Sequence, residues 1–314
     1  MSIDIIIVNY NGAKYLNNLL DSINKQTEKN WHIYIIDNAS SDSSIFIIKA
    51  HKLFLEKRIS LFELNNNTGF AKGNNIGIVN SKNEFIALIN NDVILDKDWL
   101  AKMLSLIQTD EKIGIITSKV LFAEKPQIIN SAGVLVDDSF MPFNRGMYEE
   151  DIGQYNKAEE TEAFYGAAGF IRRSVINQIG LFEPLYFMYQ EEYELSYRAK
   201  KAGWKILYNP EAVVYHFHSA SAKKYSVLKT FFSVRNYVCN TIKFLKCSDI
   251  VIAHKNFFKK VFQSKDANNQ VVDISFIKKI IIFFTIIAAY ISGIIISIPL
   301  FISYSLKKRK ILLK

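Results

Sequence analysis

Short apolar segments alternate with segments of helical periodicity through the first 110 residues, and this alternation constrains the fold more than any other feature. The β-branched run Ile3–Val8, interrupted only by Asp4, predicts a buried strand, and the apolar spacing within Ala13–Gln26 predicts an amphipathic helix. Further elements are predicted at Trp31–Ile36, Ile59–Leu64 and Phe85–Ile89 (strands) and from Ser41 to Lys57 (helix). Such alternation is typical of βαβ units, so we expect an α/β chain with a mostly parallel central sheet.

Polar residues follow directly after the predicted strands. Asn9 follows the first strand, Asp37 the second, and Asn90-Asn91-Asp92 the fourth. Ligands of open α/β sheets bind outside the carboxyl ends of the strands. We therefore expect the functional site at this edge of the sheet.

The pattern changes in the second part of the chain. Residues 111–161 indicate short strands and polar loops, which we interpret as an acceptor-side insertion. Regularity returns at Phe164–Arg172, at a helix from Glu191 to Ala202, and at the apolar strand Ala212–Tyr215.

The net charge of +9 is distributed unevenly. Residues 1–222 carry 22 Lys and Arg against 27 Asp and Glu, a balance of −5, whereas residues 223–314 carry 17 against 3, a balance of +14. A basic segment that is also apolar is more typical of attraction to anionic lipid than of nucleic-acid binding. We expect a membrane partner and no nucleic acid.

The tail divides into two parts. Residues 223–274 predict a basic extension with one or two amphipathic helices, and residues 275–314 an apolar, membrane-associated segment with a basic end. Residues 280–306 carry no charge; as one helix they would extend about 40 Å, more than a hydrocarbon core of roughly 30 Å. Gly293 and Pro299 allow a bend, so a tilted span and a re-entrant hairpin both fit. Because no export signal precedes residue 9, we expect the cytoplasmic face of the inner (plasma) membrane.

Several short motifs occur in a particular order. They are Ile5–Asn11, Asp37–Asp42, Asn67–Asn74, Asn90–Asp92, Gly166–Gly169, Met188–Leu195 and Tyr215–His218. Together they resemble glycosyltransferase family 2, in particular its rhamnosyltransferase-like bacterial branch, from residue 3 to about residue 240. The resemblance implies a GT-A fold, a Rossmann-like catalytic domain over residues 1–222. It also implies inverting transfer from a UDP- or dTDP-sugar to a saccharide acceptor, lipid-linked by our interpretation, in cell-surface polysaccharide synthesis.

The donor nucleotide has several candidate ligands. The carboxylate of Asp37 can accept from the imide N–H of uracil or thymine, although the same loop also suits an Asx turn. Gly69 begins a turn into a helix, whose free N–H groups would allow a nucleotide to approach. The resemblance assigns the nucleotide sugar to Asn9, Asp37, Asn67, Gly69, Asn74, Asn91 and Gly169. It also suggests a diphosphate contact by Arg235.

A divalent cation, Mn²⁺ or Mg²⁺, is implied by the place of Asp92 in the family's acidic motif. A cation there would neutralise charge on the departing diphosphate. The motif has one carboxylate instead of the usual two, so Asp92 is the expected direct ligand. The resemblance makes His216 a second ligand, and His218 is a weaker candidate; a histidine at a strand end can equally be a hydrogen-bonded structural residue.

The catalytic base is expected among the carboxylates that begin the helix at residue 191. The helix dipole favours carboxylates at this end in any case. The resemblance places the base at Glu192, with Glu191 as the alternative. In an inverting transfer this carboxylate takes the proton of the acceptor hydroxyl.

Two other functions compete with this interpretation. A sugar-nucleotide-binding scaffold without catalysis would fit the reduced acidic motif and the glutamate at position 192. A nucleotidyltransferase would need a basic phosphate loop after the first strand, and Asn9–Gly12 contains no basic side chain. Hydrolysis of the donor in the presence of metal separates an enzyme from a scaffold.

Overall fold

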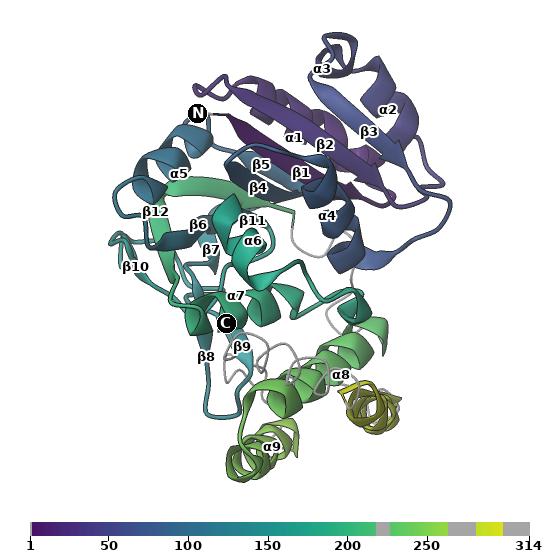
Figure 1. Ribbon diagram of the computed structural model, residues 1–314, viewed down its shortest axis with the longest axis vertical. Coiled ribbons are helices and arrows are strands. Elements are labelled where there is room, and N and C mark those ends of the chain that lie inside the picture. Colours follow the sequence, from purple (N-terminus) through teal and green to yellow (C-terminus); the bar gives the residue numbers. More distant parts are fainter. Residues whose placement is uncertain (1, 218–226, 263–280, 298–314) are drawn as a thin grey trace. The chain divides into compact units, whose positions relative to one another are not determined.

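The computed structural model describes residues 2–217, 227–262 and 281–297 (Figure 1). Its strands are β1 (Ile3–Asn9), β2 (Trp31–Asp37), β3 (Ile59–Glu63), β4 (Phe85–Asn90), β5 (Val93–Leu95), β6 (Ile113–Phe122), β7 (Lys125–Ser131), β8 (Val134–Val136), β9 (Pro142–Asn144), β10 (Glu159–Glu160), β11 (Ala168–Arg172) and β12 (Lys205–His216). Its helices are α1 (Ala13–Asn24), α2 (Ser44–Ala50), α3 (Lys52–Leu55), α4 (Gly69–Asn80), α5 (Trp99–Ile107), α6 (Arg173–Ile179), the 3₁₀ turn η1 (Pro184–Tyr186), α7 (Glu191–Lys201), α8 (Val227–Phe244) and α9 (Cys247–Phe262).

The central sheet has the strand order β10-β12-β6-β11-β4-β1-β2-β3. β1 pairs in parallel with both β2 and β4, and β2 pairs in parallel with β3. The strands predicted in the first 90 residues are thus confirmed. The helix predicted from Ser41 to Lys57 is instead two short helices, because the backbone at His51 is extended and interrupts the helical hydrogen bonds.

β6 differs from the short strands and loops expected in this region. It is a long strand inside the sheet, parallel to β12 and antiparallel to β11 and β7. Polar residues interrupt its apolar pattern, but they are buried with partners. Ser118 donates to Ala168 O at 2.9 Å, and Lys119 Nζ lies 2.8 Å from Asp151 Oδ2. Distant residues therefore make this strand stable in the core.

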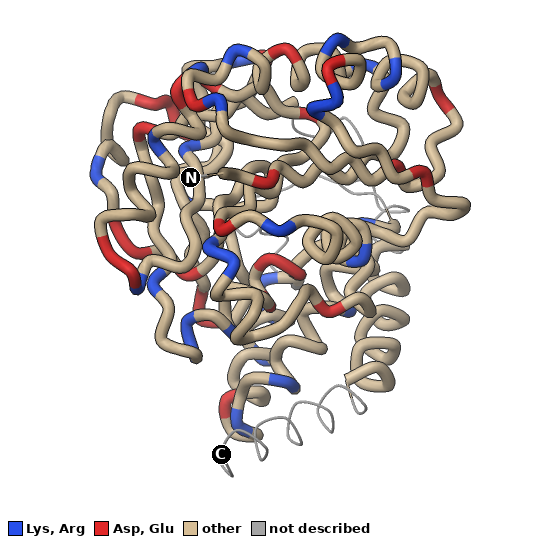
Figure 2. Tube along the Cα trace, turned by 45° about the horizontal axis from the view of Figure 1, so that its top comes forward, with Lys and Arg blue, Asp and Glu red and all other residues tan. Residues whose placement is uncertain are grey.

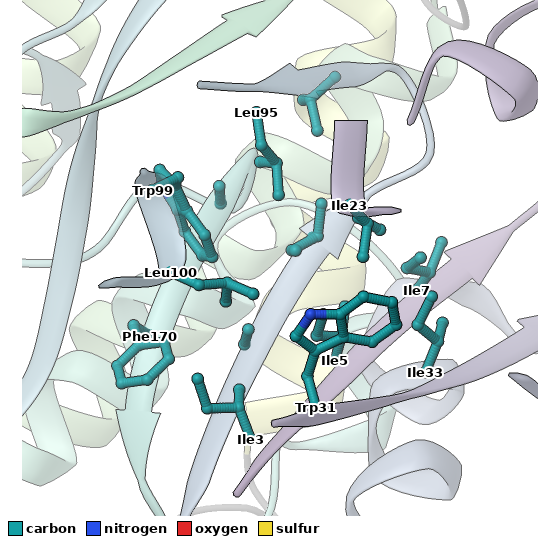
Figure 3. Close-up of a cluster of buried hydrophobic side chains, with 14 of the residues drawn as sticks. Ile3, Ile5, Ile7, Ile23, Trp31, Ile33, Leu95, Trp99, Leu100 and Phe170 are labelled. Carbon is teal, nitrogen blue, oxygen red and sulfur yellow. The ribbon is translucent and has the colours of Figure 1, made fainter. Parts of the chain in front are cut away.

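Helices cover both faces of the sheet. Ile3, Ile5 and Ile7 of β1 point to one face, where apolar residues of α1 and α5 pack on them (Figure 3). Ile6 points to the other face, toward apolar residues of α4, α6 and α7. Side chains of a strand alternate between its faces, so a run with apolar residues on both faces fits a strand covered on both sides. Asp4, the one charged residue of this run, is buried and accepts from Lys82 N and Asn83 N.

The chain forms two compact units. The first consists of residues 1–135, 144–187 and 191–220 and contains the central sheet; the second consists of residues 136–143, 188–190 and 221–314. In the second unit, α8, α9 and the helix of residues 281–297 share a small core that includes Tyr237, Phe257 and Ile286. Of the one or two amphipathic helices predicted in residues 223–274, the structure shows two, α8 and α9. The domain boundaries predicted at residues 222 and 274 lie outside the described residues.

The apolar segment predicted at residues 280–306 is described only for residues 281–297, which are helical. Among the helices that the structure describes, none is both long enough and apolar enough to cross a membrane.

Candidate active site

The polar strand ends predicted to form a site lie side by side. In the parallel register, Asn9 is level with Asp37, and Val8 is level with Asn90. Asn91 Nδ2 donates to Asn9 Oδ1 at 2.9 Å, and Asn9 Nδ2 donates to Asp37 Oδ2 at 2.8 Å. Three of the residues predicted to bind the sugar nucleotide therefore form one hydrogen-bonded row at the carboxyl edge of the sheet.

Asp37 also stabilises the turn that follows it. Ser40 donates to its carboxylate twice, from the backbone N at 2.9 Å and from Oγ at 2.7 Å. These contacts with Ser40 are those expected of an Asx turn, and the Asp37 side chain that makes them is buried. Recognition of a nucleotide base by Asp37 stays a prediction.

The start of α4 differs from the expectation of free N–H groups. Phe70 N and Ala71 N both donate to Phe187 O, at 2.6 and 3.3 Å. Gly69 has φ +82°, and a Cβ on it would overlap Phe187. The carbonyl of Phe187 thus occupies the place predicted for a nucleotide at these two amides.

The other residues assigned to the donor have partners inside the protein. Asn67 Oδ1 accepts from Gly69 N at 2.9 Å, and Asn74 Nδ2 donates to Phe70 O at 3.0 Å. A Cβ on Gly169 would meet the ring of Phe164, so tight packing explains this glycine. Contacts of Asn67, Asn74 and Gly169 with a donor stay predictions.

Asp92 and His216 lie together, as the resemblance implied. β12 pairs with β5 so that His216 is level with Val93, which directly follows Asp92. His216 Nε2 lies 3.2 Å from Asp92 Oδ1, and both side chains are largely buried. The register between β5 and β12 thus brings together two residues that are far apart in the sequence.

This pair fits a divalent cation. Adjacent ligands of an octahedral ion with bonds of about 2.1 Å lie about 3 Å apart, close to the observed separation. Within the described ranges, no group of three or more His, Cys, Asp or Glu side chains could hold a metal ion. The protein would therefore supply two ligands, and donor phosphate oxygens or water the others.

Asn130 supports this arrangement and was not predicted. The residue lies on β7, is fully buried, and its Oδ1 is 2.9 Å from His216 Nδ1. When Nδ1–H donates to this oxygen, a neutral imidazole presents the Nε2 lone pair toward Asp92. No pattern in the sequence points to Asn130, because the residue lies in the segment interpreted as an insertion.

The three carboxylates at the start of α7 have different surroundings. Glu194 forms two hydrogen bonds of 2.7 Å with Arg198, and Glu191 is buried with an oxygen that has no partner among the described residues. Glu192 is partly exposed, and a Cβ on Gly166 would overlap its Oε1. Only Glu192 combines a carboxylate without an arginine partner and access from outside, and Gly166 provides the space for it.

Burial raises the pKa of Glu192 to about 7. Burial, together with the charge of Glu192, holds the pKa of Glu191 well above its usual range. A general base works best with a pKa near the working pH. Glu192 therefore fits a base at neutral pH, and the surroundings of Glu191 favour its protonated form.

Tyr165 links the two parts of the site. Burial raises the pKa of its phenol, and the charges of Asp92 and Glu192 raise that pKa further. Its ring centroid lies 6.0 Å from that of His216. The Glu192 carboxylate lies against Gly166, which directly follows Tyr165, so the Asp92–His216 pair and Glu192 lie at a single site. The only sequence signal for Tyr165 is its position next to Gly166.

Two characterised proteins resemble the chain in sequence. It is 26% identical over 213 residues to the low-salt glycan biosynthesis hexosyltransferase Agl10 of Haloferax volcanii, covering 65% of this chain and 63% of that protein. It is 25% identical over 243 residues to the amylovoran biosynthesis glycosyltransferase AmsB of Erwinia amylovora, covering 72% of this chain and 76% of that protein. The chain therefore spans slightly less than two thirds of the Haloferax protein.

A solved structure resembles the chain in fold. The structure of GalNAc-T7 with UDP, GalNAc and Mn²⁺ superposes with a TM-score of 0.67 at 18% identity, covering 89% of this chain and 53% of that one. The chain has the GT-A fold, as expected from the motifs. The sequence model of Glycosyl transferase family 2 matches residues 4–180, which is more than half of the chain. The chain therefore belongs to glycosyl transferase family 2.

Proposed function

We propose that this chain is an inverting glycosyltransferase that moves a sugar from a UDP- or dTDP-sugar to a lipid-linked saccharide. The observation that carries the proposal is that Tyr165 and Gly166 connect the two parts of the site, because the Tyr165 ring lies beside His216 of the Asp92–His216 pair and Gly166 lies against the Glu192 carboxylate. The acceptor oxygen forms a bond to the anomeric carbon as the bond from that carbon to the diphosphate breaks. Glu192 takes the proton of the acceptor hydroxyl.

Asp92 and His216 are the residues that would hold a divalent cation. When bound, the cation neutralises negative charge on the departing nucleoside diphosphate. The presence of UDP and Mn²⁺ in the GalNAc-T7 structure supports this proposal. Asn130 would keep the imidazole of His216 oriented toward the site.

A panel of sugar nucleotides tests the proposed function. The full-length chain in detergent is incubated with UDP-, dTDP- and GDP-sugars in the presence of Mn²⁺, Mg²⁺ or a chelator, and nucleotide release is measured. We expect release from a UDP- or dTDP-sugar with metal, faster when a lipid-linked saccharide is added. Binding of a donor with no release under any condition would favour the scaffold function.

We also propose that the second unit attaches the enzyme to the cytoplasmic face of the inner membrane. Residues 281–297 carry no charge (Figure 2) and expose a stripe of large apolar side chains. Its members are Ile281, Phe284, Ile287, Ile291 and Ile295, at three- and four-residue spacing along one face of the helix. The net charge of +14 over residues 223–314 would add attraction to anionic lipid.

The double variant Phe284→Glu, Ile291→Glu is expected to bind anionic vesicles at least about tenfold more weakly, because each apolar side chain buried in the lipid contributes roughly 1.5–3 kcal/mol. Co-sedimentation of the full-length chain with phosphatidylglycerol vesicles measures this binding. Phe46→Glu is the matched control, since Phe46 is 74% exposed on α2 of the other unit. If the double variant binds like the control, or if the full-length chain fractionates without detergent as a soluble protein, the membrane proposal is wrong.

A further inference from the structure

The helix of residues 281–297 (yellow in Figure 1) has two different faces within the second unit. One face carries the exposed apolar stripe. The other packs on α8 and α9, where Ile286 and Ala289 are buried in a core that they share with Tyr237 and Phe257. Residues three and four positions apart lie on one side of a helix. The helix is therefore attached to its own unit along one side and open on the other.

Gly293 brings this helix into close contact with α8. A Cβ on Gly293 would lie 2.7 Å from Val238 Cβ and 2.8 Å from Arg235 O. Cys239 Sγ also donates to Gly293 O at 3.5 Å. Because glycine has no side chain, the backbone of one helix can lie directly against the other. Any larger residue at position 293 would push the two helices apart.

A chain of hydrogen bonds joins the same helix to α9. Tyr290 Oη bonds to His254 Nδ1, and His254 Nε2 lies 2.8 Å from Thr241 Oγ1 of α8. The Thr241 hydroxyl donates to Val238 O at 2.9 Å, so it accepts from Nε2–H, and Nδ1 accepts from the Tyr290 hydroxyl. Burial lowers the pKa of His254, which favours this neutral form of the ring. All three helices thus share one directed chain of bonds.

The surroundings of this junction are unsuited to the middle of a bilayer. Tyr290 lies one residue past the middle of the apolar helix, and its partner His254 is followed by Lys255. The side chains of Lys255 and, one turn further along α9, Lys259 are exposed. If the apolar helix crossed the bilayer, Lys255 would lie at the bilayer centre. Charged side chains are costly there, and they reach the interface only from near the ends of a span. A crossing therefore conflicts with the packing of the unit.

We propose that this helix lies flat in the membrane surface, with its axis parallel to the bilayer plane and the apolar stripe turned toward the lipid. Gly293 and Tyr290 hold it sideways against α8 and α9, so only the opposite face can enter the lipid. The partner is an anionic lipid surface, because the stripe offers apolar contact and residues 223–314 carry a net charge of +14. For residues 281–297 this arrangement replaces both the tilted span and the re-entrant hairpin. The inference rests on the proposed membrane attachment and not on the catalytic assignments.

The depths of two stripe residues test the proposal. Phe284 and Ile295 lie about three turns apart on the same side of the helix, which is about 16 Å along its axis. Each is replaced by cysteine in a full-length chain that carries Cys247→Ser, because Cys247 is exposed and Cys239 is buried. Electron paramagnetic resonance of a nitroxide on each cysteine, in phosphatidylglycerol vesicles, measures the depth of the label.

We expect both labels at one shallow depth, about 5–10 Å into the boundary between headgroups and acyl chains. A crossing helix would place them about 15 Å apart in depth, and that result would overturn the flat arrangement alone. Labels that both stay in water would overturn it together with the membrane attachment. Phe46→Cys is the matched control for a label in water, since Phe46 is 74% exposed in the first unit.

The variant Gly293→Leu tests whether contact with α8 keeps the helix flat. A leucine does not fit against Val238 and Arg235 O, so the helix should leave α8 and offer both of its faces to the lipid. The labels at positions 284 and 295 should then differ in depth. Ala288→Leu adds the same side chain on the exposed face and should leave the two depths equal. Equal depths in Gly293→Leu would contradict the role of this contact.

Discussion

Glu192→Gln is expected to lower the turnover number for sugar transfer by about 10²–10⁴-fold, with little change in donor affinity. Glutamine keeps the size and hydrogen bonding of the side chain but cannot take a proton from the acceptor hydroxyl. The partly exposed Glu192 carboxylate, fitted against Gly166, is the group in α7 that is available for this step. Steady-state transfer kinetics and calorimetric titration of the donor measure the two quantities.

Glu191→Gln is the matched control for this variant. Glu191 is buried beside Glu192, and burial with the charge of Glu192 raises its pKa and favours its neutral form, so a neutral amide should replace it with less than about a tenfold loss of rate. Near-normal turnover of Glu192→Gln together with a large loss in Glu191→Gln would assign the base to Glu191 instead.

The pH dependence of kcat/KM is a second test of Glu192 as the base. A base must be ionised to accept a proton, and burial raises the pKa of Glu192 to about 7. The value of kcat/KM should therefore rise as pH increases through about 7 and fall as pH decreases through it. The remaining activity of Glu192→Gln should lack this ionisation. A profile that rises at the ordinary pKa of glutamate would contradict the assignment.

Asp92→Ala is expected to abolish metal-dependent transfer, a loss of at least about 10³-fold, while the fold stays intact. The donor diphosphate carries two negative phosphates, and Asp92 with His216 is the ligand pair that the described residues offer for a cation. Circular dichroism checks the fold. Electron paramagnetic resonance of Mn²⁺ in the presence of UDP measures metal binding without relying on activity.

Asp96→Ala controls for the loss of a negative charge close to Asp92 in the sequence. Asp96 pairs with Lys102 at 3.6 Å on the surface, so its removal should leave metal binding and transfer close to normal. The metal assignment would fail if transfer survived both Asp92→Ala and excess chelator.

The sequence by itself determined the first half of the fold and the edge of the sheet at which the site lies. A parallel strand that is covered on both faces is apolar over most of its length, so runs such as Ile3–Val8, in which Asp4 is the one charged residue, and Phe85–Ile89 could be recognised locally. The polar residues Asn9, Asp37 and Asp92 follow these strands directly, so their convergence could also be predicted.

Only the tertiary structure decided how those residues are used. β6 escaped prediction because Ser118 and Lys119 are compensated by partners far away in the sequence. Asn130 contacts His216 because their strands lie in the same sheet, and the local periodicity of the sequence does not predict which strands pair. The choice of Glu192 over its neighbours depends on their surroundings. Glu194 pairs with Arg198, Glu191 is buried, and Glu192 occupies the space beside Gly166 where a side chain is missing. Burial and hydrogen bonding arise from contacts between distant segments, so the same residue types acquire different chemistry only after folding.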